Sequence, residues 1–181
     1  HFINTGNEAC VDFAQYLEYL AQDSGTEVCI GYIEELRDGP RFMRAAAEFA
    51  HFDGRKIPFE DGTFDAALAS CVFHHIPHDE HVALLGEICR VLGPGGRLFV
   101  FEHNPLNPLT RHAVNTCEFD EHAKLVRAPT MRRRIRDAGF AEAAIRYRIF
   151  FPHALRGMRP LEAKMTWLPL GAQYYVVARK S

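Results

Sequence analysis

The sequence predicts an α/β fold, and three observations lead to that prediction. Short apolar runs alternate with stretches of helical periodicity along the chain. Two of these runs, residues 64–72 and 97–102, flank a helical stretch, which is typical of parallel strands joined by a crossover helix. Two later runs, residues 144–151 and 173–179, have no regular helical pattern between them and favour an antiparallel pair. We therefore expect a mostly parallel sheet with an antiparallel C-terminal strand pair.

The N-terminal segment is expected to alternate helices and strands. Thr5 and Glu8 have the spacing of a capping box, and apolar residues then recur on one helical face at Phe13, Tyr16, Leu17 and Leu20. The next expected elements are a strand at 28–30, a helix at 34–47 and a strand at 47–52.

The central and C-terminal elements have clearer signals. The helix after the 64–72 strand has an apolar stripe at Val82, Leu85, Ile88, Cys89 and Leu92. Gly93-Pro94-Gly95-Gly96 ends that helix before the next strand. A further helix over 130–138 ends at Gly139 and carries an arginine run, which we interpret as a solvated face. The apolar-rich stretch 155–170 is interpreted as core packing by default, with a pocket cap or a homodimer surface as alternatives.

Length and composition predict one domain over residues 1–181, since a domain averages roughly 150 residues. Hydrophobic residues make up 48% of the chain, and the formal net charge is −2. This balance excludes a disordered chain and gives no general field for nucleic acid. We find neither a membrane-spanning run nor a secretory signal, so we expect a cytoplasmic protein with reduced cysteines. The start at His1, without a Met, reads as a trimmed fragment.

Several segments together resemble the class I S-adenosylmethionine-dependent methyltransferases. The segments are 52–54 (FDG), 57–65 (IPFEDGTFD), 74–75 (HH), 90–98 (RVLGPGGRL) and 101–103 (FEH). The resemblance covers about residues 49–104 and is greatest for the small-molecule enzymes of the ubiquinone/menaquinone type. It implies a Rossmann-like three-layer sandwich, with S-adenosylmethionine lying across the carboxyl ends of the first strands.

The resemblance implies a set of cofactor-binding residues. Asp53 would accept a hydrogen bond from the adenine amino group, and Gly54 would let the backbone approach the ring. Ser70 and Cys71, at the end of the 64–72 strand, would contact the methionine part of the cofactor. A solvated loop carboxylate at Asp53, and core packing at the other two strand-end residues, are the alternatives.

The N-terminal end departs from the family pattern. The expected glycine-rich turn offers only Gly6, and the expected acidic residue appears one place late, at Glu34. Glu34 is a candidate for the ribose hydroxyls, with a helix-start carboxylate as the alternative reading. The helices that commonly precede the first strand and cover the site have no counterpart ahead of Phe2.

Four histidines, His74, His75, His78 and His81, occupy the loop after the 64–72 strand. We interpret the loop as lining the active cleft, with His74 or His75 as candidate general base and a structural His75 as the alternative. No metal site is expected, because zinc sites need further ligands from elsewhere in the chain. Glu102, His103 and Asn104 follow the next strand at the same sheet edge and are candidates to contact the substrate.

The sequence thus predicts an enzyme that transfers a methyl group from S-adenosylmethionine to a small-molecule acceptor. The reaction is an in-line displacement, so positioning can carry the rate without a dedicated base. A catalytically impaired methyltransferase-like binding or dimerisation module is the alternative, given the N-terminal departures. A nicotinamide-dependent oxidoreductase is a third, weaker interpretation, since Gly6 alone is no dinucleotide fingerprint.

Overall fold

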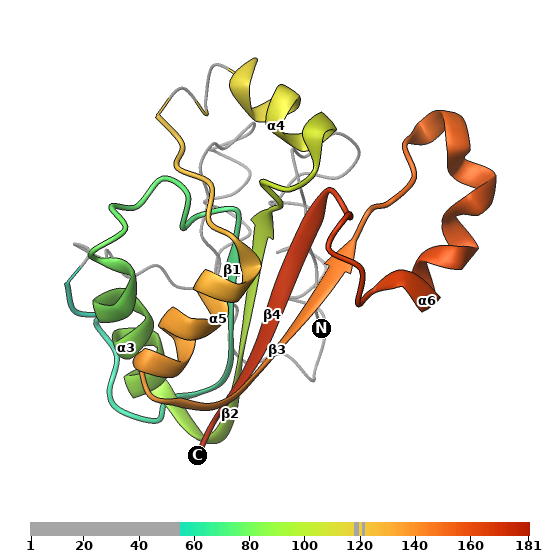
Figure 1. Cartoon of the computed structure of the whole chain (residues 1–181). Helices are drawn as coiled ribbons and strands as arrows, with labels where there is room; N and C mark the ends of the chain where they lie inside the picture. The colour runs from blue at the N-terminus through green and yellow to red at the C-terminus, as the bar shows by residue number, and fades with distance from the viewer. Residues whose placement is uncertain (1–54, 118–119, 121) are drawn as a thin grey trace, which may run out of the picture.

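The computed structural model describes residues 55–117, 120 and 122–181 (Figure 1). The helices and strands expected before residue 53 lie outside the described residues. The candidate cofactor residues Gly6, Glu34, Asp53 and Gly54 lie outside them as well. The following description therefore concerns the central and C-terminal parts of the chain.

The described residues form a sheet of four strands in the order β1-β2-β4-β3. The strands are β1 (Phe64–Ser70), β2 (Leu92–His103), β3 (Phe140–Arg148) and β4 (Gln173–Lys180). Strands β1 and β2 are parallel, whereas β4 is antiparallel to both β2 and β3. The predicted parallel pair and the predicted antiparallel C-terminal pair are both confirmed.

Helix α3 (His81–Val91) makes the crossover between β1 and β2. Its apolar side buries Leu85 and Cys89, while Val82, at the edge of the predicted stripe, is exposed. Strand β2 begins at Leu92, which was expected on the helix, and includes the glycine segment that was expected only to end the helix. A Cβ on Gly96 would lie 2.8 Å from the Gly93 carbonyl oxygen, so the close packing of this segment requires glycine.

The family-like segment before β1 is held by Arg90, near the end of α3. Its guanidinium donates hydrogen bonds to the carbonyl oxygens of Phe59, at 2.9 Å, and Ile57, at 2.8 Å. The same group pairs with Asp61 at 2.7 Å and with Glu87 at 2.9 Å. The segment resembling the family here thus has a structural role, because it fastens the entry of β1 to the crossover helix.

Helix α5 (Ala128–Asp137) lies beside α3 on the same face of the sheet (Figure 1). It contributes Met131 and Ile135 to the core, and both are fully buried. Its arginine run was interpreted as solvated, and for Arg134 this is wrong: Nη1 lies 2.7 Å from His81 Nδ1 and links the two helices. Of the three layers expected for the sandwich, the described residues contain the sheet and this one helical layer.

Helix α4 (Pro108–Asn115) was not predicted by the sequence analysis. Asn107 caps the helix, since its Oδ1 accepts a hydrogen bond from the Thr110 amide at 3.0 Å. Proline in the first turn costs nothing, because the amides there lack helical partners in any case. An Asn-Pro start followed by only eight helical residues was a signal too short to be recognised by periodicity.

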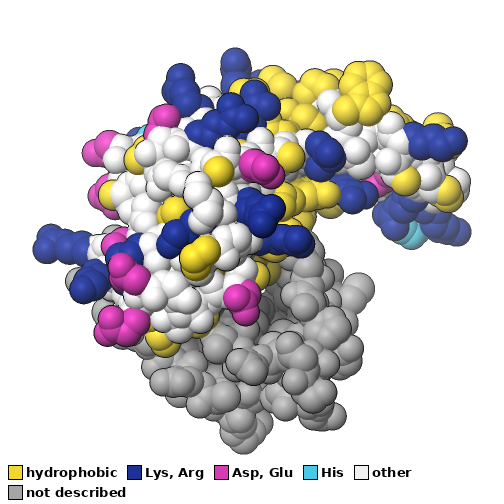
Figure 2. Space-filling model, turned by 90° about the horizontal axis from the view of Figure 1, so that it is seen from below, with side chains coloured by type: hydrophobic (Ala, Val, Ile, Leu, Met, Phe, Trp, Pro, Cys, Tyr) yellow, Lys and Arg dark blue, Asp and Glu magenta, His cyan; other side chains and the backbone are white. Residues whose placement is uncertain are grey.

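The stretch between β3 and β4 forms a projecting arm, defined here as residues 149–170, that contains η2 (His153–Leu161) and α6 (Glu162–Met165) (Figure 1). No residue of these two helices is buried, so the default expectation of core packing is wrong. Hydrophobic side chains gather on the arm beside basic ones (Figure 2), including Leu155, Met158, Leu161, Trp167 and Leu170. The pocket cap and the homodimer surface stay predictions.

Two further sequence-based expectations concern membranes and cysteines. In the part of the chain that the structure describes, no helix has both the length and the apolar content to cross a bilayer. Cys71, Cys89 and Cys117 are thiols outside any disulfide, and Cys89 is buried. The expectation of reduced cysteines is confirmed for these three, while Cys10 and Cys29 lie outside the described residues.

Candidate active site

The candidate site lies where the parallel strands β1 and β2 end. Ser70 pairs with Phe101 in the sheet register, so both chains leave the sheet at the same edge. Cys71 turns the backbone there with a φ of 55°, and its amide donates to the Phe101 carbonyl at 2.9 Å. The carboxyl ends of parallel strands are where open α/β sheets bind ligands. The loop with the four histidines begins at this point.

Glu102 organises the loop from its place at the end of β2. Its carboxylate is fully buried, and Oε1 accepts hydrogen bonds from the amides of Val72, at 3.0 Å, and Phe73, at 2.7 Å. The other oxygen, Oε2, lies 2.7 Å from His74 Nδ1. A buried carboxylate is costly unless it is hydrogen-bonded, and these three donors meet that need. The loop is therefore folded around the Glu102 side chain.

His74 is held on both sides of its ring. The Glu102 carboxylate only accepts, so Nδ1 of His74 carries a proton and donates to it. On the other side, Nε2 lies 3.3 Å from Asp120 Oδ1. The backbone is fixed as well, because the Lys124 amide donates to the His74 carbonyl at 2.7 Å. His74 is only 1% exposed, so its ring is a poor candidate for direct exchange with solvent.

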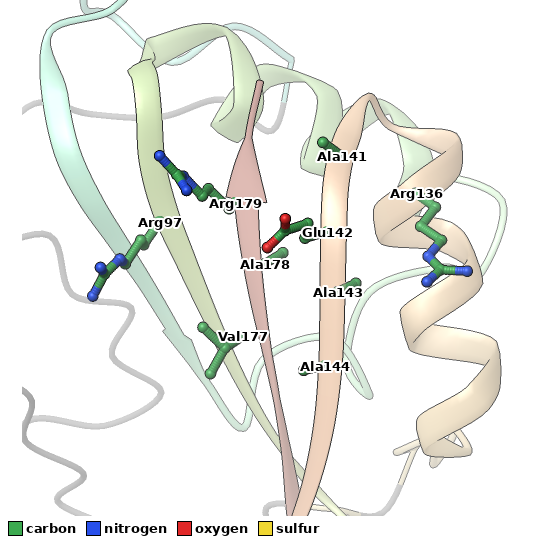
Figure 3. A pocket seen from close by; sticks show the side chains of 9 residues that line it. All are labelled: Arg97, Arg136, Ala141, Glu142, Ala143, Ala144, Val177, Ala178 and Arg179. Carbon is green, nitrogen blue, oxygen red and sulfur yellow. The ribbon is translucent and has the colours of Figure 1, made fainter.

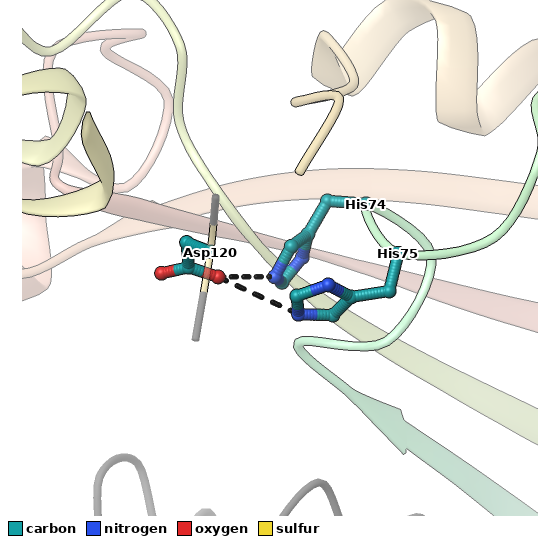
Figure 4. Close-up of side chains that lie close together, drawn as sticks. All are labelled: His74, His75 and Asp120. Atoms are coloured by element: carbon teal, nitrogen blue, oxygen red, sulfur yellow. Dashed lines mark ion pairs between the residues drawn. The ribbon is translucent and has the colours of Figure 1, made fainter. Parts of the chain in front are cut away.

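His75 and Asp120 complete the cluster on its more open side (Figure 4). Nε2 of His75 lies 3.4 Å from the same Oδ1 of Asp120 that faces His74. The side chains of His75 and Asp120 are 24% and 11% exposed. The His103 ring lies beside that of His74, with 5.1 Å between the ring centroids. Burial, with the neighbouring His74, lowers the pKa of His103.

The other two histidines of the loop turn away from the cluster. His78 Nε2 lies 3.1 Å from the Lys124 carbonyl oxygen. His81 Nε2 lies 3.1 Å from the Ile76 carbonyl oxygen, and its Nδ1 faces Arg134. Burial, with the charges of Arg134 and His78, lowers the pKa of His81. His81 is therefore a core histidine, with one ring nitrogen at the Ile76 carbonyl and the other at Arg134.

The candidate substrate residues divide into two groups. Asn104 is buried, and its Nδ2 donates to the carbonyl oxygens of Pro169, at 3.1 Å, and Gly171, at 2.8 Å. Glu102 is likewise committed to the backbone and to His74. These two were expected to contact the substrate, but both satisfy the polar groups that a turning chain would otherwise leave unpaired. His103, which is half-buried, is the remaining candidate.

Asp120 was missed by the sequence analysis. It lies far along the chain from His74 and His75, and no local spacing connects it with them.

A separate cavity of about 470 Å³ lies at the opposite end of the sheet, with Arg97, Glu142, Val177 and Arg179 among its lining residues (Figure 3). Since Arg97 pairs with Arg179 far from the strand ends that carry Glu102, this cavity is not part of the cluster.

Comparison with known protein families identifies the fold's relatives. The family described as "Methyltransferase domain" matches residues 41–149, which is more than half of the chain. The chain belongs to the methyltransferase domain family. This membership confirms the resemblance found in the sequence and, with it, S-adenosylmethionine as the cofactor of the family. His74, His75 and Asp120 all lie within the matched range.

Curated methyltransferases are similar over shorter stretches. The ubiquinone/menaquinone biosynthesis C-methyltransferase UbiE of Chromobacterium violaceum is 43% identical over 60 residues, covering 31% of this chain and 24% of that protein. UbiE of Pseudomonas fluorescens (strain SBW25) is 36% identical over 101 residues, covering 55% and 38%. The chain thus matches well under half of the length of these two relatives.

Solved structures support the same fold. An S-adenosylmethionine-dependent methyltransferase of Thermotoga maritima, described as a possible histamine N-methyltransferase, superposes with a TM-score of 0.60 at 19% identity, covering 78% of this chain and 68% of that one. An S-adenosylmethionine-dependent methyltransferase of Mesorhizobium loti gives 0.53 at 17% identity, covering 78% and 75%. At these identities the likeness concerns the fold, which is the predicted Rossmann-like α/β class.

The N-terminal segment matches a different family. The family described as "Succinyl-CoA ligase like flavodoxin domain" matches residues 1–53. A 48-residue stretch is 44% identical to acetate–CoA ligase [ADP-forming] I of Archaeoglobus fulgidus, covering 26% of this chain and 7% of that protein. Gly6 and Glu34 lie in this segment and precede the methyltransferase match. The departures from the methyltransferase pattern at these two residues agree with this finding.

Proposed function

We propose that the chain transfers a methyl group from S-adenosylmethionine to a small-molecule acceptor at the carboxyl ends of β1 and β2. Membership of the family supports the reaction class. The observation that supports the location is the cluster of His74, His75 and Asp120, which lies beside His103 at this strand end. It brings partly exposed polar side chains to the edge of the sheet where such folds bind their ligands.

The cofactor side of the proposed site begins at the end of β1. S-adenosylmethionine supplies, when bound, an electrophilic methyl group on a sulfonium. Ser70 and Cys71 are proposed to contact its methionine part, because the positive φ of Cys71 turns the backbone away from the sheet at that edge. Asp53 and Gly54 are proposed to contact the adenine. Both lie inside the methyltransferase match, and Asp53 is also the last residue of the N-terminal family match. Gly6 and Glu34 are left out of the proposed site.

The histidines take different roles in this proposal. Glu102 fixes the ring of His74 from within, which makes His74 a positioning residue. His75 is more exposed and is proposed to accept a proton from the acceptor, while the half-buried His103 is proposed to contact it. Methyl transfer depends first on the alignment of the two reactants, so a rigid strand-end cluster suits it.

Calorimetric titration of the full chain with S-adenosylmethionine and its demethylated product tests the proposal. We expect saturable binding of both, and about a tenfold loss of affinity or more in Asp53→Ala, because one charge-assisted hydrogen bond is removed. Asp79→Ala is the matched control, since Asp79 is an exposed carboxylate of the histidine loop. Its affinity should equal that of the parent chain.

The same titration separates the alternatives. If the folded parent chain binds neither form of the cofactor, the catalytically impaired binding module replaces the enzyme. Nicotinamide cofactors test the oxidoreductase interpretation, which saturable binding of those alone would favour. Coenzyme A belongs in the series because residues 1–53 match the family described as "Succinyl-CoA ligase like flavodoxin domain". Binding of coenzyme A alone would assign the chain's ligand to that segment.

The acceptor is proposed to be small and apolar. The curated relatives are named for ubiquinone and menaquinone biosynthesis, and these names support a quinone-type ring as the first acceptor to assay. Transfer of isotopically labelled methyl to a demethylated quinone precursor is the direct measurement. Labelling of polar amines but of no ring compound would overturn the apolar assignment while leaving the reaction class intact.

A further inference from the structure

We propose that His74, His75 and Asp120 bind a divalent transition-metal ion, with Zn²⁺ the best match to the donor set. The inference departs from the sequence-based expectation of no metal site. It rests on the cluster geometry and does not depend on methyl transfer. Each residue offers one ligand atom, and the three atoms all lie within 4.8 Å of one another.

Two of the three separations between the donor atoms, those to the Asp120 oxygen, fit a tetrahedral ion. The two imidazole Nε2 atoms lie 3.3 Å and 3.4 Å from the same Asp120 Oδ1. Zinc binds nitrogen and oxygen ligands at about 2.0–2.1 Å, and neighbouring ligand atoms of a tetrahedron are then about 3.3–3.4 Å apart. Two imidazoles and one carboxylate form the kind of three-residue set that holds zinc with its fourth position open.

Glu102 supplies the supporting contact that such sites use. A histidine that binds a metal through one ring nitrogen usually donates its other N–H to a carboxylate, which fixes the tautomer and the ring orientation. Here His74 Nδ1 donates to Glu102 Oε2 at 2.7 Å, so the lone pair lies on Nε2, the atom that faces Asp120. Glu102 is itself held by two backbone amides. The His74 ligand is therefore pre-positioned.

The environment of the cluster is graded from closed to open. His74 is buried, whereas Asp120 and His75 are partly exposed, so the site has an enclosed inner side and a way in from solvent. The ligands come from two segments of the chain. The Lys124 amide bonded to the His74 carbonyl ties these segments together beside the site.

The metal proposal and the general-base role of His75 make different demands on one atom. An ion at the cluster takes the Nε2 lone pair of His75, which a general base needs to be free. Methyl transfer that survives removal of the ion by a chelator would favour the base, whereas its loss and recovery with added ion would favour the metal. Metal binding itself is measured without any assay of activity.

The decisive experiment is a Co²⁺ titration of the full chain, prepared without a polyhistidine tag and stripped of metal by a chelator. We expect ligand-field absorption bands of tetrahedral Co²⁺ that saturate at one ion per chain and disappear on addition of Zn²⁺. His75→Ala and Asp120→Ala each remove a ligand and should weaken binding by at least about 100-fold. Glu102→Gln should weaken it by about 10- to 100-fold, as is typical when a supporting carboxylate is lost.

His78→Ala is the matched control, because His78 is exposed, lies in the same loop and turns away from the cluster. It should bind Co²⁺ like the parent chain. Circular dichroism of every variant establishes that it is folded, and His75→Ala, at a partly exposed position, keeps the test valid if Glu102→Gln unfolds. A folded parent chain that binds no Co²⁺ or Zn²⁺ would overturn the proposal. Equal binding by the parent and His75→Ala would overturn it as well.

Discussion

The connecting segments in the two halves of the described sheet differ in which kind of side chain they bury. In the parallel half, β1-α3-β2, the loop after β1 buries polar side chains around Glu102 and His74. In the antiparallel half, the segment between β3 and β4 leaves the sheet as an arm with exposed apolar side chains (Figures 1 and 2). Polar groups are thus enclosed at one connection, and apolar groups are exposed at the other.

This difference distinguishes a connection that needs one particular arrangement of its side chains from one that does not. Burying a carboxylate and an imidazole costs free energy unless every polar atom finds a partner, so the cluster requires a rigid and particular arrangement. The arm requires less, because no residue of its two helices is buried. Substitutions in the cluster should therefore change both stability and ligand binding, while those in the arm should change neither stability nor the cluster.

The largest expected effect is that of Glu102→Ala on stability. The substitution leaves the amides of Val72 and Phe73 and the N–H of His74 without their buried acceptor. We expect the free energy of unfolding to fall by about 3–5 kcal/mol, as when one partner of a buried charged network is removed. Urea denaturation followed by circular dichroism measures it. Glu102→Gln, whose amide oxygen still accepts, should lose less, about 1–2 kcal/mol. A loss below about 1 kcal/mol in the alanine variant would contradict the contrast between the halves.

Sequence patterns were sufficient for the four strands and for the crossover helix. The β-branched and aromatic runs predicted β1, β2, β3 and β4, and the spacing of Leu85 and Cys89 predicted α3. These elements are buried on one side, so their periodicity records the core directly. Helix α4 was missed because its eight residues start from a cap, Asn107, and show too few turns for periodicity. The arm was misread because apolar composition does not reveal whether a surface has a covering partner.

The candidate site was only partly predictable. The parallel crossover places the ends of β1 and β2 at one edge, so His74, His75 and Glu102 could be assigned to a common cleft from the sequence. What the side chains do there depends on three-dimensional contacts. Glu102 and Asn104 turn inward to satisfy backbone groups. Asp120 joins the cluster from a distant segment, and no sequence spacing records that meeting.

A second, smaller loss is expected from Tyr174→Phe, which links the halves. The Tyr174 hydroxyl, on β4, donates to the Val126 carbonyl at 2.9 Å in the segment that follows Asp120. Removing one buried hydrogen bond should lower the free energy of unfolding by about 1–1.5 kcal/mol. It should also reduce Co²⁺ affinity by a few-fold, since the Asp120 segment is held less firmly. Tyr175→Phe, on the neighbouring and more exposed position, is the control and should change stability little.

The pH dependence of stability should report His81, a buried histidine outside the cluster. Burial lowers its pKa from the ordinary value of 6.5 in the folded protein. Between the folded and the unfolded pKa, the unfolded chain therefore binds a proton at His81 and the folded chain does not. The stabilisation is complete above pH 6.5 and is lost as the pH falls through 6.5 toward the lower folded pKa, at up to about 1.4 kcal/mol per pH unit. Urea denaturation of the parent and of His81→Gln at pH values from about 7.5 to about 5.5, the range in which histidine titrates, tests this pH dependence.

The parent chain should lose more stability on acidification than His81→Gln, because the variant has no proton to bind at that position. His78→Ala is a useful second comparison, since His78 contributes to the lowered pKa of His81. It should reduce the difference without removing it. Equal pH dependence in the parent and His81→Gln would show that the contact with Arg134 does not require a neutral ring.

The smallest effect on stability is expected in the arm. Trp167 and Leu161 are 73% and 51% exposed, so unfolding gives their side chains little new contact with water. Trp167→Ala with Leu161→Ser should change the free energy of unfolding by no more than about 0.5 kcal/mol, as is usual at the surface.

Light scattering of the same double variant during gel filtration tests the predicted homodimer surface of the arm. A parent dimer that becomes monomeric in the double variant would assign the arm to self-association, because the substitutions remove apolar side chains that a second copy would cover. A monomeric parent chain would remove that assignment, and a stability loss of 2 kcal/mol or more, on the scale of a core truncation, would remove the contrast between arm and cluster.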